Sequence, residues 1–178
     1  SPVYKLQSDI DSILNYVNSI YSTYIPNSEI NMFNKSTSED GFVASNDLMY
    51  IVQKANDIYS KSNGYFDITV NNIMSLWSLY EPIYNHIIPS KSEIGHALSK
   101  TGMDMLKFDN SKIIKEHDDI SLDANSLVKG YAVDIISDFL EKQTINNYLV
   151  DIGGEIRASG NNNEGSLWSV GIQHPQND

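Results

Sequence analysis

Apolar residues recur at three- and four-residue spacing near the start of the chain, which predicts an amphipathic helix over 6–21. A polar stretch rich in Asn, Ser, Pro and Thr follows over 22–41 and is expected to be a loop. A second apolar stripe predicts a helix that begins after Ser45, whose side chain can cap the first turn. Asn63-Gly64 is expected to end this helix because both residues tolerate the left-handed conformation.

A third, short helix is expected after Ser90, which forms an S-x-x-E capping box with Glu93. The pattern then changes to short β-like runs separated by Asp- and Asn-rich turns. These runs predict strands at 105–108, 112–116 and 120–122. They would form a meander or a pair of hairpins.

The C-terminal part of the chain is expected to contain one long helix and three strands. The helix is predicted over 127–143, and the strands over 148–152, 155–159 and 167–172, with Gly153-Gly154 between the first two. Helices and hairpins are mixed without a regular βαβ alternation. The predicted class is therefore α+β, with helices packed on antiparallel sheets.

Composition narrows the range of functions. The chain has 178 residues, of which 40% are hydrophobic, and this fits one globular domain over 1–178. The formal net charge of -11 and the absence of basic clusters argue against nucleic acid as the main partner. No apolar run approaches the roughly 18 residues of a membrane-spanning helix. The lack of cysteine excludes disulfides and a thiolate zinc site.

Histidine spacing also argues against zinc. None of the four histidines has a partner at i+4, and no H-E-x-x-H motif is present; they are His86, His96, His117 and His174. Carboxylate and carbonyl oxygens would suit Mg²⁺ better, and magnesium sites usually keep waters and substrate phosphates as ligands.

The segment from Asp123 to Asp134 runs from the end of a predicted strand into a predicted helix. Unpaired N–H groups and the helix dipole could hold a phosphate there, and Lys129 would add a full charge. The alternative is an ordinary junction with a solvated lysine. The segment is not a Walker A loop, and the dinucleotide fingerprint is missing.

Three other places offer a structural and a functional interpretation. Asp67, next to Tyr65 and Phe66, either caps a turn or binds the polar edge of a planar ligand. Tyr24 either stacks on an aromatic ligand or lies on the surface of the core. Gly153-Gly154 either forms a tight hairpin or lets a ligand approach the backbone.

Taken together and in order, five blocks of the sequence resemble the signature blocks of the ApbE family, across about Tyr21 to Pro175. Their order and spacing are far more specific than any single block. The blocks are S-T-Y-I-P-N-S-E-I-N-M-F-N, G-Y-F-D-I-T-V with L-W, S-L-D-A-N-S-L-V-K-G-Y-A-V-D, Y-L-V-D-I-G-G-E-I-R-A-S-G and W-S-V-G-I-Q-H-P.

The resemblance implies an ApbE-like, T-fold-like architecture and an enzyme that binds FAD and Mg²⁺. Such an enzyme transfers the FMN moiety to a Thr or Ser hydroxyl of a partner flavoprotein and releases AMP. Relatives of this type are commonly exported, membrane-anchored lipoproteins that act on membrane redox complexes. An extracytoplasmic location, in the periplasm or at the cell surface, is therefore expected.

The resemblance also implies roles for individual residues. Tyr24 and the stretch Tyr65-Phe66-Asp67 match flavin-site positions, whereas Asp123 and Lys129 match contacts beside the adenosine and phosphates of FAD. Ser126 stands where the family offers an oxygen ligand, a backbone carbonyl, to the metal. Gly153-Gly154 would let the sheet pack close to the ligand.

Several family features have no counterpart in this chain. These are a T-M-G-T-like segment upstream and, downstream, a histidine in an H-I-x-x-P block and an Asp-rich block that ends in Thr. His174-Pro175 closes a different block, so no catalytic residue can be assigned. We expect a partial domain that lacks the family's C-terminal segment. The alternatives are an FAD pyrophosphatase, a non-catalytic flavin-binding protein or an extracytoplasmic interaction domain without a cofactor.

Overall fold

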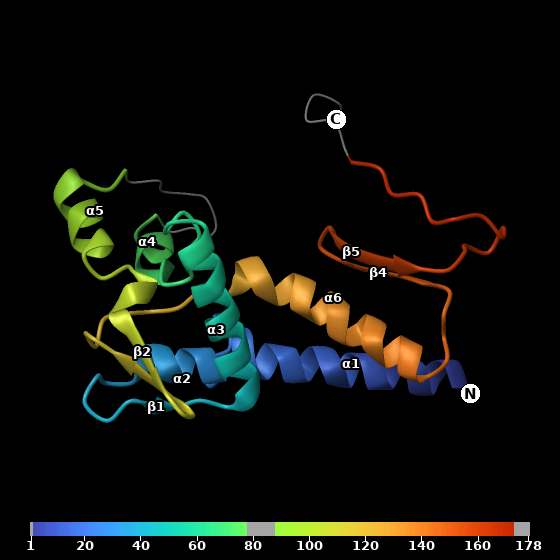
Figure 1. Cartoon of the computed structure of the whole chain (residues 1–178), viewed down its shortest axis with the longest axis horizontal. Helices are drawn as coiled ribbons and strands as arrows, with labels where there is room; N and C mark the ends of the chain where they lie inside the picture. The colour runs from blue at the N-terminus through green and yellow to red at the C-terminus, as the bar shows by residue number, and fades with distance from the viewer. Residues whose placement is uncertain (1, 78–87, 173–178) are drawn as a thin grey trace. The chain divides into compact units, whose positions relative to one another are not determined.

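The computed structural model describes residues 2–77 and 88–172, with the side chains from residue 5 onward (Figure 1). In these ranges the helices are α1 (Pro2–Tyr21), α2 (Glu29–Lys35), α3 (Asn46–Lys61), α4 (Asn71–Leu76), α5 (Lys91–Leu98), the 3₁₀ helix η1 (Met103–Met105) and α6 (Asn125–Lys142). The strands are β1 (Phe42–Val43), β2 (Leu106–Asp109), β3 (Lys112–Lys115), β4 (Tyr148–Ile152) and β5 (Glu155–Ser159).

The chain forms two compact units. One comprises Leu14–Val128, and the other comprises Ser1–Ile13 together with Lys129–Asp178. Helices α1 and α6 each contribute residues to both units. The single domain expected over 1–178 stays a prediction.

In the Leu14–Val128 unit, an antiparallel sheet has the strand order β1-β3-β2. The register pairs Phe42 with Ile113 and Leu106 with Lys115. Phe33 of α2 meets Phe42 edge-on, with ring centroids 5.7 Å apart. The core combines α2, α3, the sheet and the segment after it, and its fully buried residues include Ile30, Phe33, Leu48, Val52, Ile68, Met103, Ile113, Ile120 and Leu122.

Serine caps set the starts of three helices in this unit. Ser28, Ser45 and Ser90 each accept a hydrogen bond from a main-chain N–H of the first helical turn, of α2, α3 and α5 respectively. The capping box expected at Ser90 and Glu93 is confirmed, because the Glu93 carboxylate also accepts the Ser90 N–H. Helices α4 and α5 pack against each other (Figure 1).

The other unit contains the β4–β5 hairpin, whose register runs from Tyr148 with Ser159 to Ile152 with Glu155. Gly153 and Gly154 form its two-residue turn, with φ of 59° and 96°. Positive φ at both positions suits a tight hairpin and explains why glycine stands there. The hairpin interpretation of the glycine pair is therefore confirmed. The buried residues of α6 in this unit are Ala132, Val133, Ile136, Ser137 and Leu140.

Three expectations from the sequence were wrong. The stretch 22–41 is not all loop, because it contains α2 and ends next to β1. Residues 120–122 form no strand; Asn34 binds Leu122 with its side chain, and no neighbouring strand pairs with this segment among the described residues. Residues 167–172 form only the isolated bridge Asn161–Leu167, because the described part of the chain offers them no longer run of main-chain partners.

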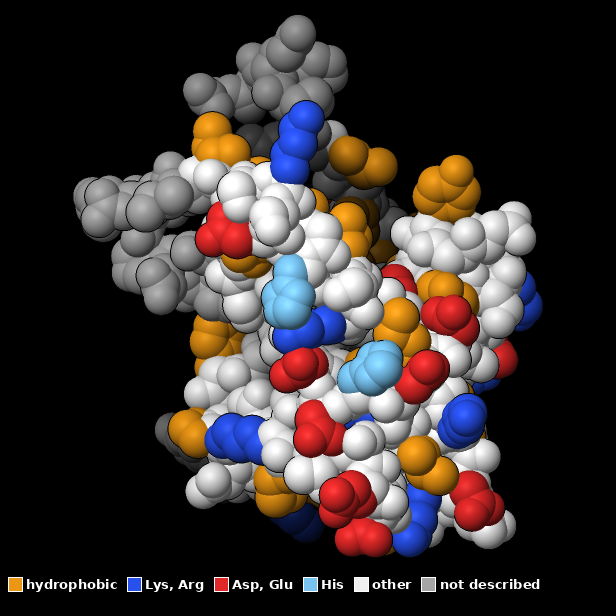
Figure 2. Space-filling model, turned by 90° about the vertical axis from the view of Figure 1, so that its left-hand side faces the viewer, with side chains coloured by type: hydrophobic (Ala, Val, Ile, Leu, Met, Phe, Trp, Pro, Cys, Tyr) orange, Lys and Arg blue, Asp and Glu red, His pale blue; other side chains and the backbone are white. Residues whose placement is uncertain are grey.

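Basic and acidic side chains are interspersed on the face of the molecule that Figure 2 shows. A continuous basic stripe of the kind that tracks a nucleic-acid backbone is not visible on this face. None of the described helices combines the length and the apolar character that crossing a bilayer requires.

Candidate functional site

Three segments that are far apart in the sequence are joined by hydrogen bonds within the Leu14–Val128 unit. They are the loop and helix over 22–34, the turn over 67–72 and the segment over 119–125. Each of them contains residues that the resemblance assigns to ligand binding. The structure thus brings Tyr24, Asp67 and Asp123 into one unit through the main chains that carry them.

Asn34 and Ile68 both bond the main chain of the segment over 119–125. The Asn34 carboxamide donates to the Leu122 carbonyl at 2.9 Å and accepts the Leu122 N–H at 2.7 Å. The next residue, Asp123, donates its N–H to the Ile68 carbonyl at 2.7 Å. Asn71 adds a side-chain bond, since its Nδ2 donates to Ser121 Oγ at 2.7 Å.

Asp67 acts as the cap of a turn. Its Oδ1 accepts hydrogen bonds from the N–H of Thr69 at 2.7 Å and from the Thr69 hydroxyl at 2.6 Å. The buried Thr69 hydroxyl in turn accepts the N–H of Gly102 at 2.7 Å. This chain of bonds fixes the orientation of the Asp67 carboxylate. Beside it, Phe66 is half-buried, whereas Tyr65 is 96% exposed.

A small cavity of about 200 Å³ lies between the first two segments and is lined by Thr23, Tyr24, Asn31, Asn71 and Ser75. Its lining is mostly polar in residue type. The Thr23 Oγ1 atom is buried and makes no hydrogen bond with the described residues. Tyr24 is 70% exposed, and an exposed tyrosine ring can stack on a planar ligand. Such a cavity suits the polar edge of a flat ring.

Asp123 and Ser126 lie at the start of α6. Asp123 is 5% exposed, and its Oδ1 accepts the N–H of Asn125 at 2.8 Å, so it satisfies one of the unpaired donors of the first turn. Ser126 is exposed in the same turn. The carboxylate of Asp123 makes this helix start less favourable for a phosphate than one without an acid.

Lys129 belongs to the other unit, where its Nζ lies 3.2 Å from Glu155 Oε2. Its side chain also passes close to Gly153. A side chain at position 153 would place its Cβ 3.6 Å from Lys129 Cδ. The lysine is thus paired with a carboxylate within the unit, and about half of its side chain is exposed. Its role as a phosphate contact stays a prediction, as do the other ligand contacts.

The described residues contain no group of three or more His, Asp and Glu side chains arranged to hold a metal ion. Asp123 and Ser126 offer oxygen ligands at the start of α6, and a magnesium site built on them would need waters and substrate phosphates as its other ligands. His96 and His117 lie in the described ranges, whereas His86 and His174 lie outside them.

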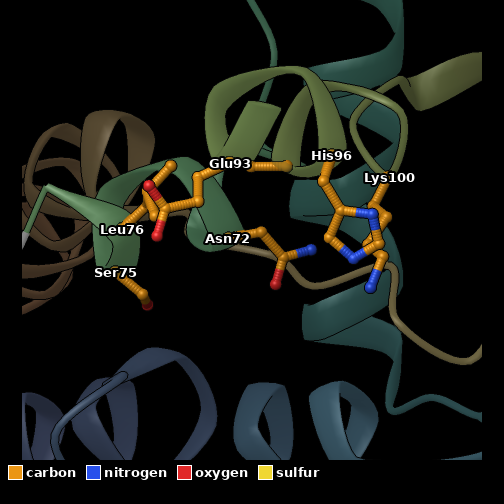
Figure 3. A pocket seen from close by; sticks show the side chains of 7 residues that line it. Asn72, Ser75, Leu76, Glu93, His96 and Lys100 are labelled. Atoms are coloured by element: carbon orange, nitrogen blue, oxygen red, sulfur yellow. The ribbon is translucent and has the colours of Figure 1, made fainter. Parts of the chain in front are cut away.

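A second cavity of about 400 Å³ lies between α4 and α5 (Figure 3). It is lined by Asn72, Ser75, Leu76, Glu93, His96, Ala97 and Lys100. Lys100 Nζ lies 2.7 Å from Asp119 Oδ2, and this contact holds the pKa of the Asp119 carboxyl below its usual value. The pKa of Glu93 is also lowered, because Ser90 donates hydrogen bonds to its carboxylate.

Sequence reasoning missed several residues that build this site, namely Thr23, Asn31, Asn34, Thr69 and Asn71. A signal was present for two of them, since Asn31 and Asn34 stand three residues apart in a short helix-compatible stretch. The others gave none. Thr69 and Asn71 each make a bond to a residue more than thirty positions away, and Thr23 Oγ1 has no partner among the described residues.

Comparison with known proteins places the chain in a family. The model of the ApbE family matches residues 2–178. The FAD:protein FMN transferase of Vibrio cholerae is 33% identical over 173 residues, which cover 97% of this chain and 52% of that protein. The protein of the same name from Haemophilus influenzae is 31% identical over 176 residues, with coverages of 96% and 51%.

A solved structure agrees with these matches. The flavin transferase ApbE from Vibrio cholerae superposes with a TM-score of 0.92 at 32% identity, and the match covers 97% of this chain and 56% of that one. The expected ApbE-like α+β architecture is therefore confirmed. The chain spans about half the length of the curated relatives it matches. On these findings, the chain belongs to the ApbE family.

Proposed function

We propose that this chain is part of an FAD:protein FMN transferase that uses Mg²⁺ and FAD to modify a partner flavoprotein. The proposal is supported by family membership and by the names of the relatives, which are FAD:protein FMN transferases. The observation that carries it is the hydrogen-bonded assembly of the segments over 22–34, 67–72 and 119–125. These segments hold three of the six residues that resemble FAD contacts, namely Tyr24, Asp67 and Asp123.

The residues present suit part of FAD. The buried Thr23 hydroxyl lacks a partner among the described residues and, with Asn31 and Asn71, lines a cavity whose polar groups match the N–H and C=O groups of a flavin edge. The exposed Tyr24 ring would stack on the flavin. The cavity of about 200 Å³ is smaller than the roughly 300–1,000 Å³ of typical ligand pockets, so it would hold only one end of the molecule.

The proposed reaction is a phosphoryl-type transfer. The hydroxyl oxygen of a Thr or Ser of the partner attacks the phosphorus of the FMN half of FAD and forms a phosphoester. The pyrophosphate bond to the AMP half breaks, AMP leaves, and the hydroxyl proton passes to solvent or a base. Such reactions depend mainly on positioning and on stabilisation of the developing charge.

The roles of this chain's residues in that reaction are binding and orientation. Tyr24, Phe66 and Asp67 would hold the flavin, with Asp67 oriented by the Thr69 hydroxyl. Asp123 would bind beside the adenosine and phosphates, held in place by Ile68 and Asn34.

Magnesium is included in the proposal because of the family resemblance. When bound, it would neutralise the pyrophosphate oxygens and the leaving phosphate. The described residues contain no ready-made group of three acidic or histidine ligands, so waters, substrate phosphates or residues outside the described ranges would complete a site at Asp123 and Ser126. We therefore assign no step to the ion.

We also propose that the protein works outside the cytoplasm, anchored to a membrane as a lipoprotein, on a flavoprotein of a membrane redox complex. Support comes from the resemblance of the sequence blocks and from the cysteine-free composition, which suits an oxidising compartment.

The test is to incubate the full protein with FAD, Mg²⁺ and a candidate acceptor protein, and to follow AMP by chromatography and the acceptor by mass spectrometry. The transferase is supported if AMP and FMN-modified acceptor appear together. AMP release without modification of any acceptor would point to an FAD pyrophosphatase instead. If FAD does not bind at all, the proposal is wrong and an interaction domain is favoured.

A matched pair of variants connects the reaction to the described site. Asp123→Asn keeps an oxygen that can accept the Asn125 N–H but removes the negative charge. We expect it to lower the rate of AMP release by at least about tenfold. Asp57→Asn, at an exposed position of α3 in the same unit, removes the same charge away from the site and should leave the rate unchanged.

A further inference from the structure

Lys115 is a lysine at the end of a strand whose charged end is buried. Only 3% of the residue is exposed. Its Nζ donates three hydrogen bonds, all to main-chain carbonyls: to Asn34 at 3.2 Å, Ser36 at 3.1 Å and Asp118 at 3.2 Å. An ammonium group has three donors, so every donor is used. The amine also lies 4.6 Å from the centre of the Phe33 ring.

The three carbonyls belong to two places in the Leu14–Val128 unit. Asn34 and Ser36 lie at the C-terminal end of α2, where carbonyls lack partners within the helix and a cation is favourable. Asp118 lies in the turn that leads from β3 to the segment containing Leu122. The Lys115 amine therefore hydrogen-bonds both the end of α2 and the turn that precedes the segment containing Leu122.

Asn34 continues this connection. Its main-chain carbonyl accepts from Lys115, and its side chain holds both the N–H and the carbonyl of Leu122. Leu122 precedes Asp123, whose N–H is bonded to Ile68. The contacts thus lead from Lys115 through Asn34 to the backbone that carries Asp123.

Stability alone does not explain a buried ammonium group in this place. Taking the charge out of water is costly, and an apolar side chain of similar volume often serves a buried position equally well or better. Methionine would fill the same space beside Phe33 without that cost. What it could not do is bond three carbonyls on separate parts of the main chain.

We propose that Lys115 is a positioning residue for the ligand site: acting through Asn34, it sets the place of the Leu122–Asp123 backbone. The part of this inference that concerns the ligand rests on the proposed binding of FAD. The part that concerns the backbone does not.

The test uses Lys115→Met in the full protein with two measurements. Amide hydrogen exchange at residues 120–125, relative to exchange at Ile113, reports on the backbone. Titration with FAD reports on the site. We expect relative exchange at Leu122 and Asp123 to rise about tenfold and FAD to bind about tenfold more weakly, because charge-assisted hydrogen bonds are lost.

Two further lysine variants separate positioning from general effects. Lys115→Arg keeps a cation with several N–H donors and should recover part of the loss in both measurements. Lys107→Met removes an exposed lysine from the neighbouring strand β2 and should change neither. Should Lys115→Met fail to fold, Asn34→Asp carries the test, because it keeps an acceptor for the Leu122 N–H and loses the donor to the Leu122 carbonyl.

The outcomes distinguish this inference from the proposed function. If folded Lys115→Met exchanges at Leu122 and Asp123 as the wild type does, or binds FAD equally well, the positioning role is wrong. If the wild-type protein does not bind FAD, the proposed function fails. The exchange measurement then still decides whether Lys115 sets the backbone.

Discussion

The side chain of Asn34 substitutes for a neighbouring strand: it hydrogen-bonds both main-chain groups of Leu122, 88 positions further along the sequence. Leu122 is fully buried, so its N–H and carbonyl have no access to water if the carboxamide is removed. We expect Asn34→Ala to lower the free energy of unfolding by about 3 kcal/mol, because two buried polar groups lose their partner. Chemical denaturation followed by circular dichroism measures this loss.

Asn72→Ala is the matched control for this prediction. The Asn72 carboxamide also donates to a main-chain carbonyl, that of Asp119, but in an exposed place. Water can replace this bond, so a loss of less than about 1 kcal/mol is expected. If the two variants lost equal free energy of unfolding, the burial of Leu122 would not determine the size of the loss.

Lys115 should make stability depend on pH in the alkaline range. Burial lowers the pKa of Lys115 to about 8 from the ordinary 10.5, against the opposing effect of Asp118 and Asp119. Between these two pH values the unfolded chain binds more protons than the native protein, so stability rises with pH. Relative to Lys115→Met, the wild type should therefore gain up to about 3 kcal/mol between pH 8 and 10.5.

The measurement is a series of denaturation curves for both proteins across this pH range. Subtracting the variant removes the contribution of the tyrosines and other lysines, which are shared. A constant difference across the range would mean that the amine keeps an ordinary pKa, and hence that its three hydrogen bonds offset the burial.

Local signals in the sequence were sufficient for most helices and for the hairpins. Serine caps and apolar stripes determined the starts of α3 and α5, and Asn63 and Gly64 do adopt positive φ, of 53° and 81°. The β4–β5 hairpin followed from its glycine pair. In these places the chemistry that decides the structure lies within a few residues, so it can be read from the sequence.

The elements that the sequence predicted wrongly, or did not predict, depend on partners that are distant in the sequence. Helix α2 is only seven residues long, and its Pro- and Asn-rich approach resembles a loop; burial of Ile30 and Phe33 in the core stabilises it. The segment over 120–122 alternates apolar and polar residues as a strand does, but Asn34 takes the place of a strand neighbour. The same holds for the site, where Asn34, Asn71 and Lys115 act on residues dozens of positions away.

A charge cluster in the unit that contains the β4–β5 hairpin gives a prediction that does not involve the ligand. Arg157 of β5 hydrogen-bonds three carboxylates spaced four and three residues apart on α6; they are Asp134, Asp138 and Glu141. The hydrogen bonds to Asp134 and Asp138 raise the pKa of Arg157. We expect Arg157→Met to lower the free energy of unfolding by about 1 kcal/mol at low salt, because the group is partly exposed and water screens the interaction.

High salt should reduce this loss, since it screens both the attraction in the wild type and the repulsion among the carboxylates in the variant. Lys129→Met removes a single exposed ion pair with Glu155 from the same unit and should cost less than about 0.5 kcal/mol. A loss for Arg157→Met that did not change with salt would indicate packing of the arginine stem instead of charge.

Tyr24 offers the most direct test of the flavin site, because its exposed ring allows binding and stability to be separated. With 70% of the residue exposed, Tyr24→Ala should change the free energy of unfolding by less than about 0.5 kcal/mol. It should weaken FAD binding about tenfold through loss of stacking, whereas Tyr24→Phe, which keeps the ring, should bind FAD nearly as the wild type does. Titration followed by flavin fluorescence measures the affinity of both Tyr24 variants for FAD.

Tyr50→Ala, at another exposed tyrosine of the same unit, controls for general effects of removing a surface ring. If Tyr24→Ala binds FAD with wild-type affinity, Tyr24 lies on the surface of the core as an ordinary loop tyrosine, and the flavin must bind elsewhere in the protein.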